Sequence, residues 1–168
     1  LYMAVSANGL IAREDDRTDW SPEEWQAFRA EVAKAEGIII GRKTYEIMQS
    51  GEELSQLKET GVVVVSSALR GRKPPYANMS FAGSPQEALA IFQKKGAGTV
   101  LVAGGAMLNT SFIRYGLFDE IFLDIEPDIF GKGVPLLEPE DLECTLQLLS
   151  VRHLSENTVQ LHYKVLAQ

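Results

Sequence analysis

Short apolar runs recur along the chain, and segments with helical periodicity separate them. The runs lie at residues 1–5, 38–40, 62–65, 99–103 and 121–125. Runs this short, rich in Ile and Val and without alternating polar positions, are typical of strands buried on both faces of a parallel sheet. Residues 10–12 resume an apolar line after the first run. The pattern therefore predicts a sheet of mostly parallel strands.

Capping residues predict a helix in the gap between the apolar residues 10–12 and the apolar run at 38–40. Ser21 suits the N-cap, Pro22 the first helical position, and Glu24 completes a capping box. Apolar side chains then follow at helical spacing, at Trp25, Phe28, Val32 and Ala35. Further helical segments follow the strands at 38–40, 62–65 and 99–103. Helices that alternate with parallel strands in this way cover both faces of a sheet.

The C-terminal part of the chain has a different pattern. Residues 158–165 alternate between apolar and polar positions, which gives a strand with one apolar and one polar face. Residues 145–152 are the expected antiparallel partner across a turn at 155–157. No linker or repeat divides the chain. We therefore expect one α/β domain over residues 1–168, with a mostly parallel central sheet, helices on both faces and an antiparallel C-terminal hairpin.

Composition and charge exclude several classes of partner. The chain has 168 residues, of which 45% are apolar and 23% charged, and its net charge is −7. Acids and bases are interspersed without a basic stripe, so we expect no nucleic-acid partner. No apolar run approaches the roughly 20 residues of a membrane helix, so we expect no membrane partner and a cytoplasmic location. Cys144 is the only cysteine, and the histidines lack neighbours at ligand spacing, so no metal site is expected.

Two expectations concern the ends of the chain. The hairpin leaves an exposed antiparallel edge and an apolar face, which favours a homodimer. Leu1 begins directly within an apolar run, so we expect residues of the first strand to precede it in the full protein.

Small or polar residues follow the strands at the points where these end. The clusters are residues 6–9, 41–44, 66–67 and 104–105. The carboxyl ends of parallel strands meet at one edge of the sheet, where such sheets bind ligands. Glycine lets an anion approach the N–H groups that begin a helix, and Arg42 and Thr44 add phosphate donors. The sequence thus predicts a phosphorylated ligand, although each cluster alone also suits a tight turn, a solvated Arg or a capping Thr.

Glu24 is the candidate catalytic acid because it lies between a polar loop and an apolar helix face. It would serve as a general acid, or as an anchor for an N–H pair of a substrate, if burial tuned its pKa. The alternative is a capping-box Glu that accepts the Ser21 backbone N–H. Trp20 and Trp25 are candidate walls for a planar substrate, or core residues. No GxSxG, GxxxxGK[ST] or GxGxxG motif occurs, which argues against a serine hydrolase, a P-loop nucleotidase and the usual dinucleotide-binding turn.

A set of ordered motifs resembles the dihydrofolate reductase-like superfamily. The motifs are S-A-N-G-L-I-A, I-I-I-G-R-K-T-Y-E, V-V-S-S, V-A-G-G-A-M-L and L-F-D-E-I-F-L-D-I-E-P-D-I-F-G-K-G-V-P-L. Within the superfamily the chain is most similar to the reductase domain of bifunctional riboflavin-biosynthesis proteins, the RibD C-terminal domain, and to its stand-alone relatives. The resemblance covers nearly the whole chain. It implies a dihydrofolate reductase-like fold that binds NADPH across the carboxyl edge of the sheet.

The resemblance also implies roles for individual residues. Residues of this chain match four segments of the family. One contacts the cofactor phosphates, and a second is the glycine pair under the pyrophosphate. The third is the helix after that pair, and the fourth is the loop near the nicotinamide. These implied cofactor residues are Asn8, Ile11, Gly41, Arg42, Thr44, Ser66, Ser67, Ala103, Gly104, Gly105, Met107 and Leu108. The implied substrate residues are Asn8, Trp20 and Glu24, with Glu24 as the catalytic acid.

Two positions depart from riboflavin-pathway reductases. Asn8 stands where Asp is usual, and Ala103 stands where Glu is usual. The expected function is an NADPH-dependent reductase of a small planar heterocycle, either a dihydrofolate-like pteridine or a pyrimidine precursor of riboflavin. The departures motivate an alternative, a nucleotide-binding protein on the same fold without reductase chemistry. A third possibility is an enzyme that uses the cleft for a non-redox phosphorylated ligand.

Overall fold

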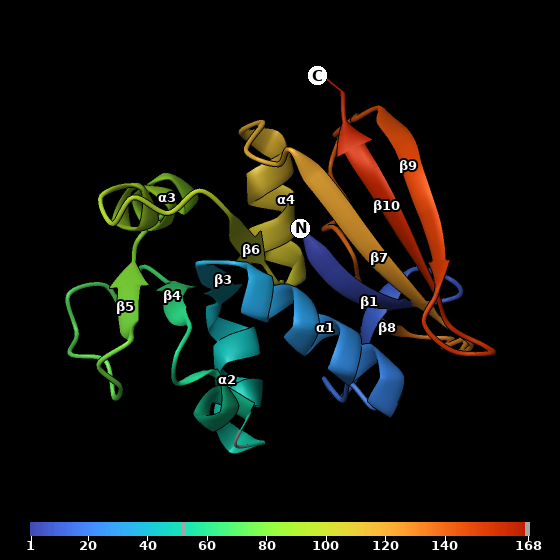
Figure 1. Ribbon diagram of the computed structural model, residues 1–168, viewed down its shortest axis with the longest axis horizontal. Coiled ribbons are helices and arrows are strands. Elements are labelled where there is room, and N and C mark those ends of the chain that lie inside the picture. Colours follow the sequence, from blue (N-terminus) through green and yellow to red (C-terminus); the bar gives the residue numbers. More distant parts are fainter. Residues whose placement is uncertain (52, 167–168) are drawn as a thin grey trace.

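The computed structural model describes residues 1–51 and 53–166, in which the helices lie between strands and the C-terminal part consists of strands (Figure 1). Every strand and helix predicted from the apolar pattern is present. In chain order the elements are β1 (Tyr2–Ser6), β2 (Leu10–Arg13), α1 (Pro22–Lys34), β3 (Gly37–Gly41), α2 (Arg42–Ser50), the 3₁₀ helix η1 (Glu53–Leu57), β4 (Gly61–Val65), β5 (Met79–Ala82), α3 (Pro85–Gln93), β6 (Val100–Val102), α4 (Ala106–Arg114), β7 (Glu120–Glu126), β8 (Gly133–Pro135), β9 (Leu146–His153) and β10 (Val159–Val165).

Strands β5, β4, β3 and β6 form a parallel four-stranded sheet, in that order. Successive side chains of β3 point to opposite faces, as a strand requires. Ile38 and Ile40 pack against α1 and α2, whereas Ile39 packs against α3 and α4, and all three are fully buried. Figure 1 shows the two pairs of helices on opposite sides of this sheet. The predicted α/β class with helices on both faces is therefore confirmed.

The remaining strands pair in two further groups. β1 pairs in parallel with β7, and β10 pairs antiparallel with both β7 and β9, so the predicted C-terminal hairpin is confirmed. β2 pairs with β8 in a separate antiparallel ladder. The pairing thus differs from the expected single sheet. Alternation along a strand indicates which faces are buried, but it carries no information about which strand lies beside it.

Two strands were not predicted, β5 and β8. The segment of β5 has only four residues and lies between a Pro-rich loop and the Ser84 cap of α3, so no periodicity stands out. The segment of β8 has three residues, of which the first is Gly133 and the last Pro135, and both types are depleted in strands. Both strands form because a longer neighbour offers them a hydrogen-bonding edge.

The polar face of the C-terminal hairpin is not simply exposed to solvent. Thr158 and Gln160, on that face, are buried and donate hydrogen bonds to acidic side chains of β7. Buried polar groups are stable only with such partners. Here β10 covers the acids of β7, so its polar positions become part of the interior.

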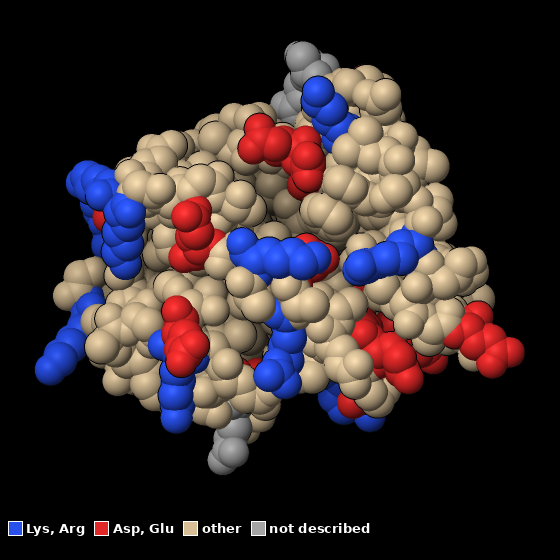
Figure 2. All heavy atoms as spheres, in the orientation of Figure 1, with Lys and Arg blue, Asp and Glu red and all other residues tan. Residues whose placement is uncertain are grey.

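Several surface features bear on the expected partners, which remain predictions. The edge strand β9 exposes Leu148, Leu149 and Val151, and the expected homodimer stays a prediction. On the face seen in Figure 2, basic and acidic side chains are interspersed. Within residues 1–51 and 53–166, no helix has the length and apolarity that a membrane crossing requires.

Candidate functional site

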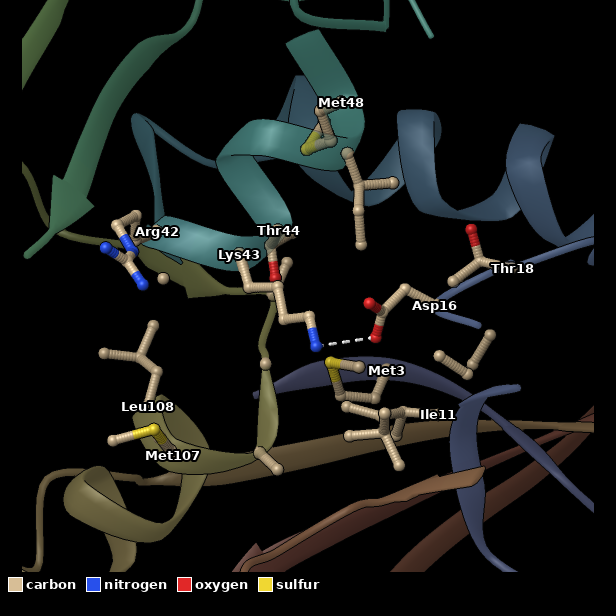
Figure 3. Close-up of a pocket in the computed structure, with 18 of the residues that line it drawn as sticks. Met3, Ile11, Asp16, Thr18, Arg42, Lys43, Thr44, Met48, Met107 and Leu108 are labelled. Carbon is tan, nitrogen blue, oxygen red and sulfur yellow. Dashed lines mark ion pairs between the residues drawn. The ribbon is translucent and has the colours of Figure 1, made fainter. Parts of the chain in front are cut away.

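A large cleft runs along the edge of the parallel sheet where the strands end. Its volume is about 1150 Å³. Its walls come from β1, β2, α1, α2, η1, α4 and β8, with the loops after β2, β4 and β6. In Figure 3, side chains from the first turn of α2, the start of α4 and the loop after β2 point into the same space. Segments far apart in the sequence thus form one site.

Glycines bring backbone donors together at one end of the cleft, which we call the glycine end (Gly41, Arg42, Thr44, Gly104 and Gly105). The backbone N–H of Gly41 donates to the carbonyl oxygen of Gly104 at 2.7 Å, so the ends of β3 and β6 meet directly. A Cβ atom on Gly41 would lie 3.4 Å from the backbone nitrogen of Gly105. Gly104 has a φ of +77°, in the left-handed region that favours glycine, and it is joined to Gly105 by a cis peptide bond.

Two helices begin at the glycine end. Helix α2 follows Gly41 and α4 follows Gly105, and no side chain of the described residues caps either N-terminus. The first N–H groups of a helix lack partners within the helix and carry partial positive charge, which makes them donors to anions. The Thr44 hydroxyl lies 3.7 Å from the position of a Cβ on Gly105. This end can therefore hold a phosphate group with backbone donors, a hydroxyl and the nearby Arg42 guanidinium.

An ion pair lies in the middle of the cleft. The Lys43 ammonium group, from the first turn of α2, lies 2.8 Å from the carboxylate of Asp16 in the loop after β2 (Figure 3). Asp16 itself has a φ of +66°, uncommon for a residue other than glycine. The pair links the loop to α2 beside the glycine end. Neither residue was predicted, because their proximity depends on the tertiary structure.

Most of the predicted site residues line this cleft. The cofactor candidates that do so are Ile11, Gly41, Arg42, Thr44, Ser66, Ser67, Ala103, Gly105, Met107 and Leu108, joined by the substrate candidates Trp20 and Glu24. Gly104 acts through its backbone and, in the described part of the chain, does not line the cleft.

The side chain of Asn8, another predicted site residue, makes its contacts outside the cleft. Its side chain accepts a hydrogen bond from the Ser6 hydroxyl at 2.9 Å and donates to the Phe130 carbonyl at 2.7 Å. Its amide therefore ties the turn after β1 to the loop after β7. Among the described residues, Asn8 does not line the cleft.

Glu24 is buried at the cleft, with 6% of its surface exposed. The Ser21 hydroxyl caps α1 by accepting the Glu24 backbone N–H at 3.2 Å. The reciprocal half of the capping box is absent among the described residues, because the Ser21 N–H donates instead to the Glu126 carboxylate at 3.2 Å. The Glu24 side chain is thus free of the capping role and has no hydrogen-bond partner within residues 1–51 and 53–166.

Burial raises the pKa of the Glu24 carboxyl group from 4.5 to about 8, and the nearby Asp124 and Glu126 carboxylates add to this. A charged carboxylate is costly in a site with little water and beside like charges. At neutral pH Glu24 is therefore mostly a neutral acid that faces the cleft. Such a group can donate a proton to a bound molecule.

Two acids of β7 that sequence reasoning missed support this site. Asp124 is fully buried and Glu126 nearly so. Asp124 accepts hydrogen bonds from the Tyr2 hydroxyl and, at 2.8 Å, from the Gln160 amide, while burial raises its pKa. One signal was available: both acids occupy alternate positions at the end of β7, directly after the apolar residues 121–123. No group of three or more His, Cys, Asp or Glu side chains suited to a metal ion occurs in the described part of the chain.

Comparisons with known proteins agree with this architecture. Residues 1–160 match the model of the family described as the RibD C-terminal domain. The chain is 28% identical over 171 residues to the uncharacterised protein YwjB of Bacillus subtilis, which covers 97% of this chain and 95% of the relative.

Two solved structures have the same fold. A putative riboflavin biosynthesis protein from Shewanella sp. PV-4 superposes with a TM-score of 0.83 at 21% identity, over 99% of this chain and 97% of that one. A diaminohydroxyphosphoribosylaminopyrimidine deaminase/5-amino-6-(5-phosphoribosylamino)uracil reductase from Thermotoga maritima superposes with a TM-score of 0.74 at 18% identity, over 98% of this chain but 55% of that one. On the family match over residues 1–160, this chain belongs to the RibD C-terminal domain family.

Proposed function

We propose that the protein is an NADPH-dependent reductase that acts on a small planar heterocycle, a pteridine or a pyrimidine. The observation that carries the proposal is the buried Glu24 carboxyl group in the same cleft as two helix N-termini that have no side-chain cap among the described residues. Membership of the family supports a reductase-like function, and one solved relative is described as a uracil reductase.

The residues of the glycine end fit a phosphate-bearing dinucleotide. Side chains are missing at Gly41 and Gly105, where a Cβ would narrow the space in front of the N–H groups. Arg42 is more than half exposed, and its only described ion-pair partner is Glu46 at 3.7 Å. In this proposal Arg42 and the hydroxyls of Ser66 and Ser67 bind the 2′-phosphate, because charged and hydroxyl donors both suit phosphate oxygens.

The chemistry divides between cofactor and protein. When bound, NADPH supplies a hydride. The protein holds the heterocycle next to it, and Trp20 and Trp25 offer flat apolar surfaces along the cleft. Reduction of a ring C=N bond adds the hydride to carbon and a proton to nitrogen. Glu24 gives that proton from its carboxyl group and later regains one from water.

Titration with NADPH and NADH tests the proposal. We expect NADPH to bind at least about tenfold more tightly than NADH, because a charged hydrogen bond to the 2′-phosphate contributes roughly 1.5–3 kcal/mol. The Arg42→Ala variant should lose most of this preference, while its affinity for NADH stays close to that of the wild type. Quenching of tryptophan fluorescence measures both affinities. Equal binding of the two cofactors would contradict the assigned 2′-phosphate site.

Turnover separates the proposal from its alternative. NADPH that binds but is not oxidised in the presence of any pteridine or pyrimidine would favour a nucleotide-binding protein that lacks reductase chemistry. Binding of phosphate esters with no preference for NADPH over adenosine monophosphate would favour a non-redox ligand.

The ion pair in the middle of the cleft gives another prediction. In this proposal Lys43 turns from Asp16 toward a cofactor phosphate, so the Asp16 carboxylate competes with the ligand. We expect Asp16→Asn to tighten NADPH binding about two- to fivefold, because a partly exposed ion pair contributes up to roughly 1 kcal/mol and the variant no longer has to break it. The gain should shrink at high ionic strength, which screens the pair in the wild type. Weaker binding in Asp16→Asn would show that Asp16 supports the ligand site instead.

A further inference from the structure

We propose that the substrate region of this cleft selects planar heterocycles that carry no phosphate or carboxylate tail. This inference rests on the proposed function and narrows its substrate class. The region, which we call the substrate arm, is the part of the cleft between α1 and the α2–η1 segment, lined by Glu24, Trp25, Phe28, Ile47, Met48, Glu53 and Gln56.

The walls of the substrate arm are aromatic and apolar. The rings of Trp25 and Phe28 stack with centroids 5.4 Å apart. Phe28 and Met48 belong to one core cluster, with Trp25 packed against it, so these side chains are held in place by the interior. Fixed apolar surfaces of this kind suit a flat ring system.

Among the described residues that line the substrate arm, the ionisable groups are two acids, Glu24 and Glu53. Glu53 is half-buried at the beginning of η1, and burial raises the pKa of its carboxyl group. A Cβ on Gly51 would lie 3.2 Å from the Glu53 carboxyl carbon, so this carboxylate folds back over the chain at the rim of the cleft. Gln56, one turn further along η1, adds a neutral amide.

Basic side chains lie elsewhere. Among the described residues that line the cleft, the cations are Arg42 and Lys43, both in the first turn of α2 beside the glycine end. Lys43 is paired with Asp16. Arg29 on α1 and Lys58 just after η1 do not line the cleft in the described structure.

This distribution of charge sets the selectivity. A phosphate or carboxylate group in the substrate arm would lose water, meet Glu53, and find no cation among the described residues that line the arm itself. Like charges placed together in this way are a common means of rejecting a wrong partner. A ring with a neutral side chain avoids both the desolvation of a charge and the repulsion by Glu53. The arm therefore favours an uncharged heterocycle over the phosphorylated or glutamylated form of the same ring.

Two matched pairs of compounds test the inference. The first pair is 7,8-dihydrobiopterin and 7,8-dihydrofolate, which share a dihydropterin ring but differ in a carboxylate-bearing tail. The second is 5-amino-6-ribosylaminouracil and its 5′-phosphate. Binding to the whole protein is followed by tryptophan quenching, with and without saturating NADPH. We expect the uncharged member of each pair to bind at least about tenfold more tightly.

Charge reversal provides the complementary test. The double variant Glu53→Lys, Gln56→Arg places two cations in the substrate arm, and we expect it to bind the charged member of each pair at least about tenfold more tightly than the wild type does. The control is Glu59→Lys, which repeats the Glu53→Lys change of charge at an exposed residue that does not line the cleft in the described structure. It should leave the preference unchanged.

The outcomes distinguish this inference from the proposed function. Equal or tighter binding of the charged members by the wild type, or binding of no member of either pair, overturns the inference. A preference for the uncharged members that Glu53→Lys, Gln56→Arg reverses supports it. NADPH oxidation is measured separately, so a protein that shows the preference without turnover would fail as a reductase and still bear out the charge selectivity.

Discussion

Replacing Glu24 with Gln is expected to lower kcat by about 100-fold or more, the range that a general acid contributes. Gln has nearly the same shape but no acidic proton, so the bound heterocycle loses its proton donor. NADPH affinity should change little, because Glu24 lies on α1, away from the glycine end. Steady-state kinetics and a cofactor titration measure the two effects. A variant with undiminished kcat would remove Glu24 from the mechanism.

The control for this variant is Glu23→Gln, one residue earlier on the same helix. Glu23 is exposed and does not line the cleft in the described structure. It is a glutamate in the same first turn of α1, so the exchange tests the effect of replacing a carboxyl group with an amide at that helix end. Activity should be retained in Glu23→Gln.

The pH profile of the wild type should report the same carboxyl group. With a pKa of about 8, Glu24 holds its proton at neutral pH and loses it above pH 8. We therefore expect kcat/KM to be flat up to about pH 8 and to decline above it. The Glu24→Gln variant, with no proton to lose, should show a low and flat profile over this range.

Glu24→Gln is expected to lower kcat but to raise the free energy of unfolding. The pKa of this carboxyl group is about 8 in the folded protein against 4.5 as its ordinary value, so the folded state retains a proton that the unfolded state releases. The resulting contribution to the free energy of unfolding is fully present below pH 4.5 and is lost as the pH rises toward 8. Glu24→Gln should therefore gain stability relative to the wild type with rising pH, by roughly 4 kcal/mol at pH 8, since one pKa unit corresponds to about 1.4 kcal/mol. Thermal unfolding at pH 5 and pH 8 measures this gain.

Replacing Gly41 with Val is expected to weaken NADPH binding by about 10- to 100-fold. The added Cβ would lie 3.4 Å from the Gly105 nitrogen and 3.7 Å from the Leu108 Cβ, which places the two methyl groups beside the N-terminus of α4. They would block backbone donors that bind a charged phosphate, and each such hydrogen bond is worth roughly 1.5–3 kcal/mol. A cofactor titration gives the change in affinity.

Folding should survive this substitution. Gly41 has φ and ψ of −80° and 166°, an extended conformation that suits Val, and the contacts of the new Cβ are ordinary. The matched control is Gly131→Val, in the loop after β7, where a Cβ would meet no described atom within 4 Å. Both variants should unfold within a few degrees of the wild type. Unchanged NADPH affinity in Gly41→Val would place the phosphate away from the glycine end.

The prediction of the fold depended on local pattern. Ile38, Ile39 and Ile40 form a run with no polar position, and the structure buries all three between two layers of helices. The Ser21 cap and Pro22 set the beginning of α1. These features can be predicted from short stretches of sequence, because side chains repeat every two residues on one face of a strand and every 3.6 residues on one face of a helix. Strand pairing is not local, so β5, β8 and the division into three ladders were missed.

The candidate site also has features that local sequence predicts and features that only the tertiary structure sets. Gly41 and Gly105 were predicted from sequence because a strand that ends in glycine before a helix places backbone donors at the sheet edge, whatever the remaining contacts. The character of Glu24 could not be predicted. Its neighbours Asp124 and Glu126 come from β7, about a hundred positions away, and Glu126 takes the Ser21 N–H that a capping box would have given to Glu24. A pKa depends on burial and on nearby charges, and only the tertiary structure sets these.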